Sequence, residues 1–243
     1  DEKGDVKPQM VDKYEASADK LTHTFTLRDG LAWHDGAPVT AEDCVASLAR
    51  WSKKDSLGQK LYTFVDNVSA KDAKTFVMKL KELTGLVITA LGKPSSNVPF
   101  MMPKRVADTD PNTQIADFTG SGPFIFKKEE WKPGDKTVYV KNDKYKPRAE
   151  PASGLAGGKI VNFDRIEWRA ISDHQQSANA LLAGEIDYVE QPPHDLIPLY
   201  KKDANVKLWD YNPLGNQYVF RPNHLQKPFD NPLVRKAMRL ATD

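Results

Sequence analysis

Apolar and polar positions alternate at Phe25-Thr26-Leu27, which predicts a half-buried strand. Two Asp-Gly pairs follow, at residues 29–30 and 35–36, and such pairs accept the positive φ of tight hairpin turns. The residues between the two turns predict a second strand, and Pro38 stops its pairing because proline has no backbone N–H to donate. Residues 25–38 therefore predict a compact hairpin.

The pattern then changes from alternation to helical spacing. Thr40 occupies the N-cap position of a predicted helix, and Asp43, three residues later, completes a capping box. Apolar side chains recur on one side of this helix at Cys44, Val45, Leu48 and Trp51. Cys44 is interpreted as a buried structural residue, because free cysteines commonly behave as small hydrophobes.

Further elements are predicted up to about residue 115. They are strands over Val65–Ala70 and Thr75–Leu80, a short helix over Leu86–Leu91 and another helix after Pro103. Between the two helices lies a polar surface loop, Lys93-Pro94-Ser95-Ser96-Asn97.

From Gly120 onward the predicted strands and helices alternate, which favours a mixed α/β fold. The strands are Phe124–Glu130, Thr137–Asn142, Arg165–Ala170, Glu185–Val189, Val206–Tyr211 and Gln217–Phe220, and the helices are His174–Ala183 and His194–Tyr200. Residues 146–159 are rich in Pro, Gly and Ala and predict a loop. The strand and G-K-[ST] spacing of a P-loop are missing there, so nucleotide binding is not expected.

Five motifs follow one another along the chain. The first is residues 25–51, described above. The other motifs are GSGPF at 120–124, VYVKNDKY at 138–145, ALLAGEID at 180–187, and Asn223 followed by KPFDNPLVRKA at 227–237. Together they resemble the peptide-binding class of bacterial extracellular solute-binding proteins, family 5, whose first motif is FxLRxGxxFHDGxPxTAxDVxxSxxR, with Val where this chain has Cys44. Their shared order over nearly the whole chain makes the resemblance specific.

The resemblance implies a periplasmic-binding-protein type II-like fold, in which two lobes close around a ligand by a hinge. Residues 1–117 would form the smaller subdomain of the first lobe, 118–218 part of its main α/β subdomain, and 219–243 the start of the second lobe. Family members are longer, so the chain is expected to be an internal fragment, truncated at both ends.

In this family, peptides lie extended in the cleft and form main-chain hydrogen bonds with the protein. The resemblance implies eight candidate ligand contacts in this chain, and for each of them an ordinary structural or solvent-exposed role is the alternative. They are Tyr62, Ser95, Ser96 and Asn97 from the smaller subdomain, and Glu190, Gln191, Asn216 and Gln217 from the main subdomain and its hinge side.

Charge and composition exclude several other classes of protein. The 35 Lys and Arg residues balance 33 Asp and Glu residues without a basic stripe, which argues against nucleic-acid binding. No apolar run approaches the roughly 18 residues that read as a membrane span. The chain has one cysteine, so it cannot form an intramolecular disulfide.

Catalytic, metal and cofactor sites are not expected. None of the histidines (His23, His34, His174, His194 and His224) forms an i,i+4 pair or an HExxH motif, and no G-x-S-x-G sequence occurs. His34 and Asp35 are interpreted as turn residues bonded to neighbouring backbone, with a metal or substrate contact as the alternative. Trp33 and Trp51 are interpreted as core residues rather than a stacking platform.

The sequence therefore indicates an exported receptor that captures peptides and delivers them to an inner-membrane ABC permease. It would be periplasmic and monomeric, with its signal peptide outside this chain. A receptor for a nickel chelate, opine or sugar is the alternative within the same fold, and an enzyme or scaffold is a more distant one.

Gly122 and Pro123 are expected to form a tight turn into the strand at Phe124. If Gly122 has a positive φ, a Gly122→Val substitution should lower stability by about 1–3 kcal/mol, because glycine alone adopts that conformation without strain.

Overall fold

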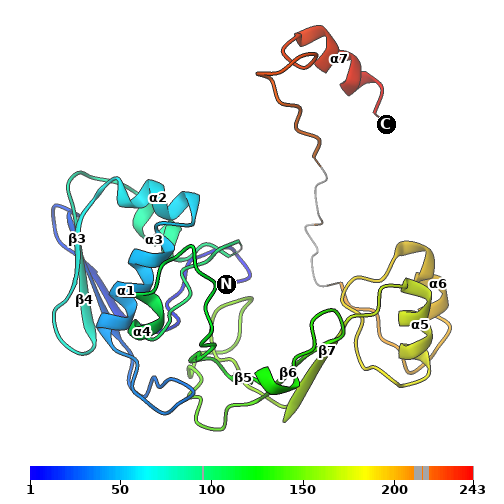
Figure 1. The fold of residues 1–243 in the computed structure, drawn as a ribbon, viewed down its shortest axis with the longest axis horizontal. Coiled ribbons are helices and arrows are strands. Elements are labelled where there is room, and N and C mark those ends of the chain that lie inside the picture. The colour runs from blue at the N-terminus through cyan, green and yellow to red at the C-terminus, as the bar shows by residue number, and fades with distance from the viewer. Residues whose placement is uncertain (95, 211–214, 216–218, 243) are drawn as a thin grey trace. The chain divides into compact units, whose positions relative to one another are not determined.

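The computed structural model describes residues 1–94, 96–210, 215 and 219–242. Residues 1–170 form one compact unit and residues 171–243 form a second. Among the described residues, helices occur in both units and every strand belongs to the first (Figure 1). The predicted mixed α/β class is confirmed. The predicted division at residues 117 and 218 remains a prediction.

The first four strands form one antiparallel sheet. They are β1 (Val11–Ala16), β2 (Thr22–Leu27), β3 (Val65–Ala70) and β4 (Thr75–Leu80), in the order β1-β2-β4-β3. The bounds predicted for β3 and β4 are confirmed. Along β2, His23, Phe25 and Leu27 are buried and the threonines between them are partly exposed. One face of β2 therefore belongs to the core.

The second strand predicted for the hairpin is not formed. Ala32 and Pro38 make one isolated bridge, and pairing resumes where the Val39 N–H donates to the Leu31 carbonyl at 3.1 Å. Pro38 interrupts a regular ladder because it has no N–H to donate. Both Asp-Gly turns are confirmed, since their glycines have φ of 77° and 92°.

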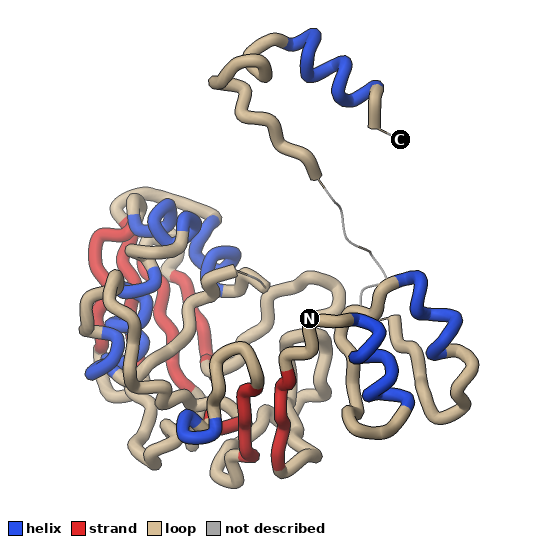
Figure 2. Tube along the Cα trace, turned by 45° about the vertical axis from the view of Figure 1, so that its right-hand side comes forward, coloured by secondary structure: helices blue, strands red, loops and turns tan. Residues whose placement is uncertain are grey.

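Four helices accompany this sheet (Figure 2). They are α1 (Ala41–Trp51), α2 (Ser56–Tyr62), α3 (Leu86–Leu91) and α4 (Lys104–Ala107). The predicted capping box of α1 is confirmed, because Thr40 and Asp43 each accept a hydrogen bond from the backbone N–H of the other. Helix α1 contacts β3, β4 and α4, and α2 contacts α3 and β3.

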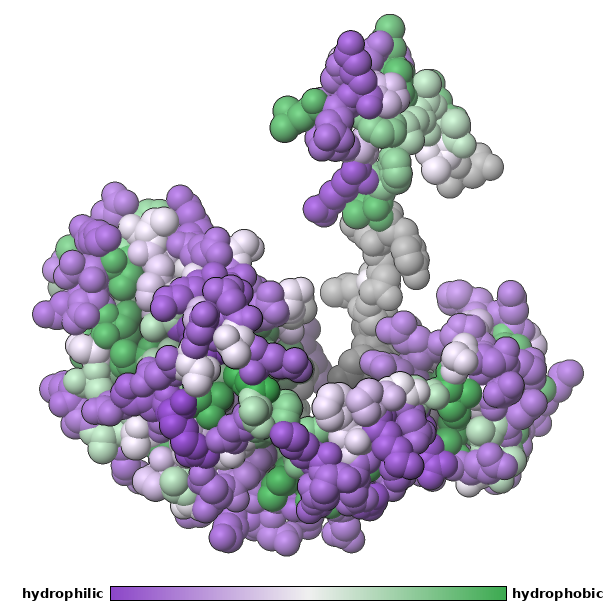
Figure 3. All heavy atoms as spheres, in the orientation of Figure 1, coloured by the Kyte–Doolittle hydropathy of each residue, from purple (hydrophilic) through white to green (hydrophobic). Residues whose placement is uncertain are grey.

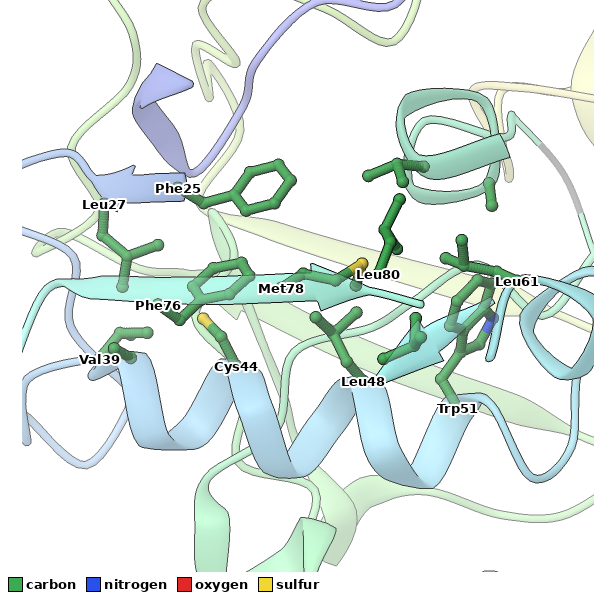
Figure 4. Close-up of a cluster of buried hydrophobic side chains, with 14 of the residues drawn as sticks. Phe25, Leu27, Val39, Cys44, Leu48, Trp51, Leu61, Phe76, Met78 and Leu80 are labelled. Carbon is green, nitrogen blue, oxygen red and sulfur yellow. The ribbon is translucent and has the colours of Figure 1, made fainter. Parts of the chain in front are cut away.

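The core lies between α1 and the sheet (Figure 4). The rings of Phe25 and Phe76 stack with centroids 4.9 Å apart, and Cys44 points toward them from α1. Cys44 is 2% exposed, and this burial raises the pKa of its thiol to about 12. Trp33 and Trp51 also belong to the core, as predicted. On the face drawn in Figure 3, polar side chains separate the hydrophobic patches of the first unit.

The carboxylate of Asp43 is a polar centre beside this core. Its Oδ2 atom accepts hydrogen bonds from the backbone N–H of Thr40 at 2.8 Å and from Nε1 of Trp33 at 3.2 Å. Its Oδ1 atom accepts from the backbone N–H of Lys104 at 2.6 Å. One side chain of α1 thus holds the hairpin, its own helix start and the first residue of α4.

A second polar contact lies within the sheet. The Tyr14 hydroxyl donates to Nδ1 of His23 at 2.7 Å, and Nε2–H of His23 donates to the Lys20 carbonyl, 3.1 Å away. We assign this neutral tautomer because a carbonyl can only accept. Burial lowers the pKa of His23, and the bond to the Lys20 carbonyl opposes that shift without cancelling it.

A three-stranded antiparallel sheet completes the first unit. Its strands are β5 (Phe124–Phe126), β6 (Lys136–Lys141) and β7 (Arg165–Arg169), in that order. The strand predicted to continue to Glu130 ends earlier, because the chain turns into a short 3-10 helix, η1 (Lys128–Glu130). A bidentate pair between Arg165 and the Glu130 carboxylate, at 2.6 and 3.1 Å, holds that turn against β7.

The Pro- and Gly-rich segment 146–159 contains no helix or strand, as predicted. Its Arg148 side chain is 11% exposed and donates to the carbonyls of Gln9, at 3.3 Å, and Val11, at 2.9 Å. The same guanidinium forms a bidentate pair with Glu150 and holds the pKa of that carboxyl at about 2. Arg148 therefore ties the loop to the start of β1.

The second unit contains α5 (His174–Leu182), a 3-10 turn η2 (His194–Leu196) that leads into α6 (Ile197–Tyr200), and α7 (Pro232–Leu240). Asp173 caps α5 by accepting a hydrogen bond from the backbone N–H of Gln176 at 2.7 Å. The two helices predicted between residues 174 and 200 are confirmed.

The strands predicted at Glu185–Val189 and Val206–Tyr211 are wrong for the residues that the structure describes. The N–H groups of Glu185 and Ile186 both donate to the Ala180 carbonyl, so this segment begins as the turn that ends α5. Val206 likewise closes a turn by donating to Asp203. A strand pairs with a neighbouring strand in a ladder, and neither segment forms a strand among the described residues. Tyr211 and residues 217–218 of the last predicted strand lie outside the described residues, and residues 219–220 do not form a strand.

Removing the Asp43 carboxylate should destabilise the first unit more than removing a neighbouring exposed acid. Asp43→Ala is expected to lower the free energy of unfolding by about 3 kcal/mol, because the indole of Trp33 and the N–H of Lys104 lose a buried acceptor. Glu42→Ala, at an exposed position of the same helical turn, is the control and should cost less than about 0.5 kcal/mol. Urea unfolding measures both, and equal losses would contradict the prediction.

The buried imidazole of His23 predicts a loss of stability on mild acidification. The unfolded chain takes up a proton as the pH falls below about 6.5, whereas folded His23 resists protonation because its pKa is lowered. The free energy of unfolding should therefore be highest above about pH 6.5 and fall as the pH is reduced to 5. Urea titrations at several pH values should show a flatter profile for His23→Gln than for the wild type. An unchanged slope would refute the assignment to His23.

Candidate functional site

The loop after α3 carries the ligand-contact residues predicted for the smaller subdomain. Ser96 and Asn97 are exposed and have φ of 53° and 39°, which are left-handed values for residues that have a Cβ. Such conformations cost of order 1–3 kcal/mol each and persist where surrounding contacts enforce them. Ser95 lies outside the described residues.

Two contacts hold the ends of this loop. The Trp51 indole Nε1–H donates to the Asn97 carbonyl. At the other end, Nζ of Lys93 lies 2.5 Å from Oδ2 of Asp55. Asp55 also caps α2 by accepting from the Gly58 N–H at 2.8 Å. The loop is therefore held by Trp51, at the end of α1, and by Asp55, the N-cap residue of α2.

The Asp55 carboxylate is nearly buried, and its charge is stabilised by these contacts. Burial alone would raise its pKa, but the hydrogen bonds from Lys93 and from the Gly58 N–H outweigh burial and hold the pKa below its usual value. The ammonium charge of Lys93 is thus already paired. The loop consequently offers exposed Ser96 and Asn97 side chains, rather than the Lys93 charge, to a ligand.

Tyr62, predicted to contact ligand, belongs to α2 and packs against the core. Its hydroxyl is buried and has no hydrogen-bond partner in the described structure. This burial raises the pKa of Tyr62 to about 12. Tyr62 therefore packs α2 against the core, and its hydroxyl does not reach solvent.

The remaining predicted contacts belong to the second unit. Glu190 and Gln191 are exposed and lie between α5 and η2. Asn216 and Gln217 lie outside the described residues. Tyr62, Ser96 and Asn97 thus belong to the first unit, and Glu190 and Gln191 belong to the second.

A second group of motif residues meets within the first unit, and sequence reasoning missed it. The backbone N–H of His34 donates to the Gly120 carbonyl at 2.8 Å, and the Gly120 N–H donates to His34 Nδ1 at 3.2 Å. Nε2–H of His34 donates to the Gly122 carbonyl at 3.1 Å, which also accepts from Nδ2 of Asn142 at 3.0 Å. We call this cluster of His34, Gly120, Gly122 and Asn142 the junction.

The junction corrects part of the interpretation of His34. The histidine bonds backbone, as predicted, but that backbone lies more than 80 residues along the chain rather than beside it. The signal was present in the sequence, because His34, the GSGPF box and Asn142 each belong to a motif. Their spacing alone did not indicate that the three motifs meet.

Asp35 supports the same hairpin through two contacts. Its Oδ1 accepts from the Ala37 N–H at 3.0 Å, which confirms its turn role, and its Oδ2 pairs with Arg105 of α4 at 2.9 Å. The Ala37 N–H and the Arg105 guanidinium lower the pKa of Asp35. Arg105 also pairs with Asp117 at 3.0 Å, just before the GSGPF box.

Among the described residues, no group of three or more His, Cys, Asp and Glu side chains is placed to hold a metal ion. No described helix has the length and apolar character needed to cross a membrane.

Comparison with known proteins gives consistent matches. A family model for bacterial extracellular solute-binding proteins, family 5, middle part, matches residues 5–243. A probable peptide ABC transporter periplasmic-binding protein from Sinorhizobium fredii is 45% identical over 240 residues, which are 98% of this chain and 45% of that protein. The chain thus spans less than half the length of this curated relative.

Solved structures show the same fold. The oligopeptide-binding protein of Bacillus subtilis in complex with a nonapeptide is 26% identical, with a TM-score of 0.58 over 76% of this chain and 35% of that one. A periplasmic binding protein from A. tumefaciens R10 in complex with agropinic acid is also 26% identical, with a TM-score of 0.63 over 83% and 38%.

These matches define a solute-binding protein of the periplasmic type II-like fold, as the sequence motifs predicted. The chain belongs to the bacterial extracellular solute-binding proteins, family 5. The family is one of receptors rather than enzymes.

In the GSGPF box, the position that lacks room for a Cβ is Gly120 and not Gly122. Gly122 does not have a left-handed φ, and a Cβ built on it meets nothing within 4 Å. The strain expected for Gly122→Val is therefore contradicted. A Cβ on Gly120 would lie 3.1 Å from Cε1 of His34, whose ring is fixed by hydrogen bonds on both nitrogens.

Gly120→Val is accordingly expected to lower the free energy of unfolding by about 1–3 kcal/mol, because the His34 ring cannot move away without losing its bonds. Gly122→Val is the matched control, two residues away in the same box, and should change stability by less than about 0.5 kcal/mol. Thermal and urea unfolding test the pair. A larger loss for Gly122→Val would show that the junction is described wrongly.

Proposed function

We propose that the protein containing this chain is the extracytoplasmic receptor of an ABC importer and that it captures peptides. The chain contributes the smaller subdomain of the first lobe, residues 1–117, part of the main subdomain, residues 118–218, and the start of the second lobe, residues 219–243. The ligand occupies the cleft between the lobes, and closure by a hinge commits it for delivery to the inner-membrane permease.

The observation that carries the choice of peptide is the 45% identity, across 98% of the chain, to a relative named as a probable peptide-binding protein. The fold alone does not choose a ligand. Structures that share 26% identity with this chain hold a nonapeptide in one case and agropinic acid in another. An opine receptor is therefore the second candidate.

The described loop suits a peptide main chain. Ser96 and Asn97 are exposed and offer hydroxyl and amide groups, which can donate to and accept from backbone amides. The Lys93 charge is taken by Asp55, so this loop favours main-chain contacts over recognition of a peptide terminus. Glu190 and Gln191, which are exposed, are further proposed contacts. The proposal also includes Ser95, Asn216 and Gln217.

We further propose that the receptor is periplasmic and monomeric and that it uses no cofactor. Mass spectrometry of the full-length protein, purified without a ligand-stripping step, should show a mixture of short peptides that is released by denaturation. A single opine or a metal chelate in that fraction would favour the second class of receptor. Turnover of an added peptide would refute the receptor role.

The 243-residue chain should bind the same ligands far more weakly than the full-length receptor does. It spans under half of its curated relative, so it lacks much of the enclosure that buries a ligand. Calorimetry with trialanine should give a clear binding isotherm for the stripped full-length protein and at least a tenfold weaker one for the chain, a difference of about 1.4 kcal/mol. Equal affinities would show that the site lies wholly within residues 1–243.

A further inference from the structure

The Asp55–Lys93 ion pair is unusual for its burial. Nζ of Lys93 and Oδ2 of Asp55 are 2.5 Å apart, and the two side chains are 15% and 4% exposed. Removing both charges from water offsets much of their attraction, so a buried pair contributes little net stability compared with apolar residues of similar size. Stability alone is therefore a poor explanation for this pair.

The pair joins the loop to a rigid support. The Asp55 N–H donates to the Trp51 carbonyl at 3.0 Å, which continues the end of α1, and the Asp55 side chain caps α2 through the Gly58 N–H. Asp55 is thus fixed by both helices before it meets Lys93. The Lys93 ammonium group is held in one place because its acceptor, the Asp55 carboxylate, is itself fixed by hydrogen bonds to α1 and α2.

Both loop anchors originate from one turn of the chain. Trp51 holds the Asn97 carbonyl, and Asp55, four residues later, holds Lys93. The backbone between the two anchors includes Ser96 and Asn97 in left-handed conformations. Without the anchors, ordinary residues at these positions would relax to commoner backbone angles.

We propose that Asp55 and Lys93 are positioning residues for ligand binding, which hold the loop in the conformation that presents Ser96 and Asn97 to the peptide. The inference rests on the proposed function, in which those two residues contact the ligand. A loop held in its bound conformation spares the ligand the cost of ordering it. If only a tenth of the molecules kept that conformation, the apparent affinity would fall tenfold.

The test uses the full-length protein and four variants of the pair, one of which, Lys93→Arg, keeps both charges. Asp55→Asn removes the charge and keeps an acceptor for the Gly58 N–H, because asparagine is also a good N-cap. Lys93→Met removes the other charge and keeps an unbranched chain. The double variant Asp55→Asn/Lys93→Met leaves no buried unpaired charge. Lys74→Met breaks the exposed Lys74–Asp29 pair and is the matched control.

Two measurements separate positioning from stability. Calorimetry with trialanine should show about tenfold weaker binding for both single variants and for the double variant, and wild-type affinity for Lys74→Met. The thermal midpoint should fall in the single variants and recover in the double variant, because no uncompensated charge remains there. Lys93→Arg, which keeps the ion pair, should restore affinity. Wild-type affinity in the double variant would overturn the proposal.

A third measurement keeps the inference distinct from the proposed function. The indole N–H of Trp51, assigned by its loss in Trp51→Phe, should exchange with solvent faster in the double variant than in the wild type, whatever the ligand. If the wild-type protein fails to bind trialanine, the peptide assignment fails, and this exchange rate still decides whether the pair holds the loop. Unchanged exchange in the double variant would overturn the positioning role.

Discussion

Three consecutive side chains of the hairpin determine how the first unit is assembled. Trp33 bonds the Asp43 carboxylate of α1, His34 bonds the backbone of Gly120 and Gly122, and Asp35 pairs with Arg105 of α4. Each contact joins the hairpin to a different segment of the chain. The short hairpin, which has one isolated bridge instead of a ladder, is thus fixed from outside by tertiary hydrogen bonds.

This arrangement connects the two sheets of the first unit. Gly122 precedes β5, and Asn142 follows β6, so the junction lies where the chain enters the three-stranded sheet after leaving the four-stranded one. The Gly122 carbonyl oxygen accepts two hydrogen bonds, one for each of its lone pairs. Hydrogen bonds between segments that are distant in the sequence thus tie the hairpin to the three-stranded sheet.

Local chemistry predicted the elements that depend on nearby residues. The capping box of Thr40 and Asp43, the two Asp-Gly turns and the alternation in β2 each involve contacts within a few positions, and all were found. The strand predicted from Glu185 failed because its first N–H groups close the turn after α5. The junction, the Asp43–Lys104 contact and the Lys93–Asp55 pair join residues 20 to 88 positions apart, and such contacts leave no periodic trace in a sequence. Candidate ligand residues came from the family resemblance, and the structure adds how Ser96 and Asn97 are held.

The burial of Cys44 determines what the chain can tolerate in an oxidising compartment. A thiol whose pKa is about 12, packed between α1 and the aromatic side chains of β2 and β4, carries almost no thiolate at neutral pH, and thiolate is the form that reacts. In the folded chain, Cys44 therefore resists cross-linking to a second copy under oxidising conditions. For the same reason, the Cys44 thiol should not react with maleimide reagents in the folded chain. A fluorescent dye coupled to a cysteine introduced on the exposed loop would then report from that one position, with the wild-type thiol left in place.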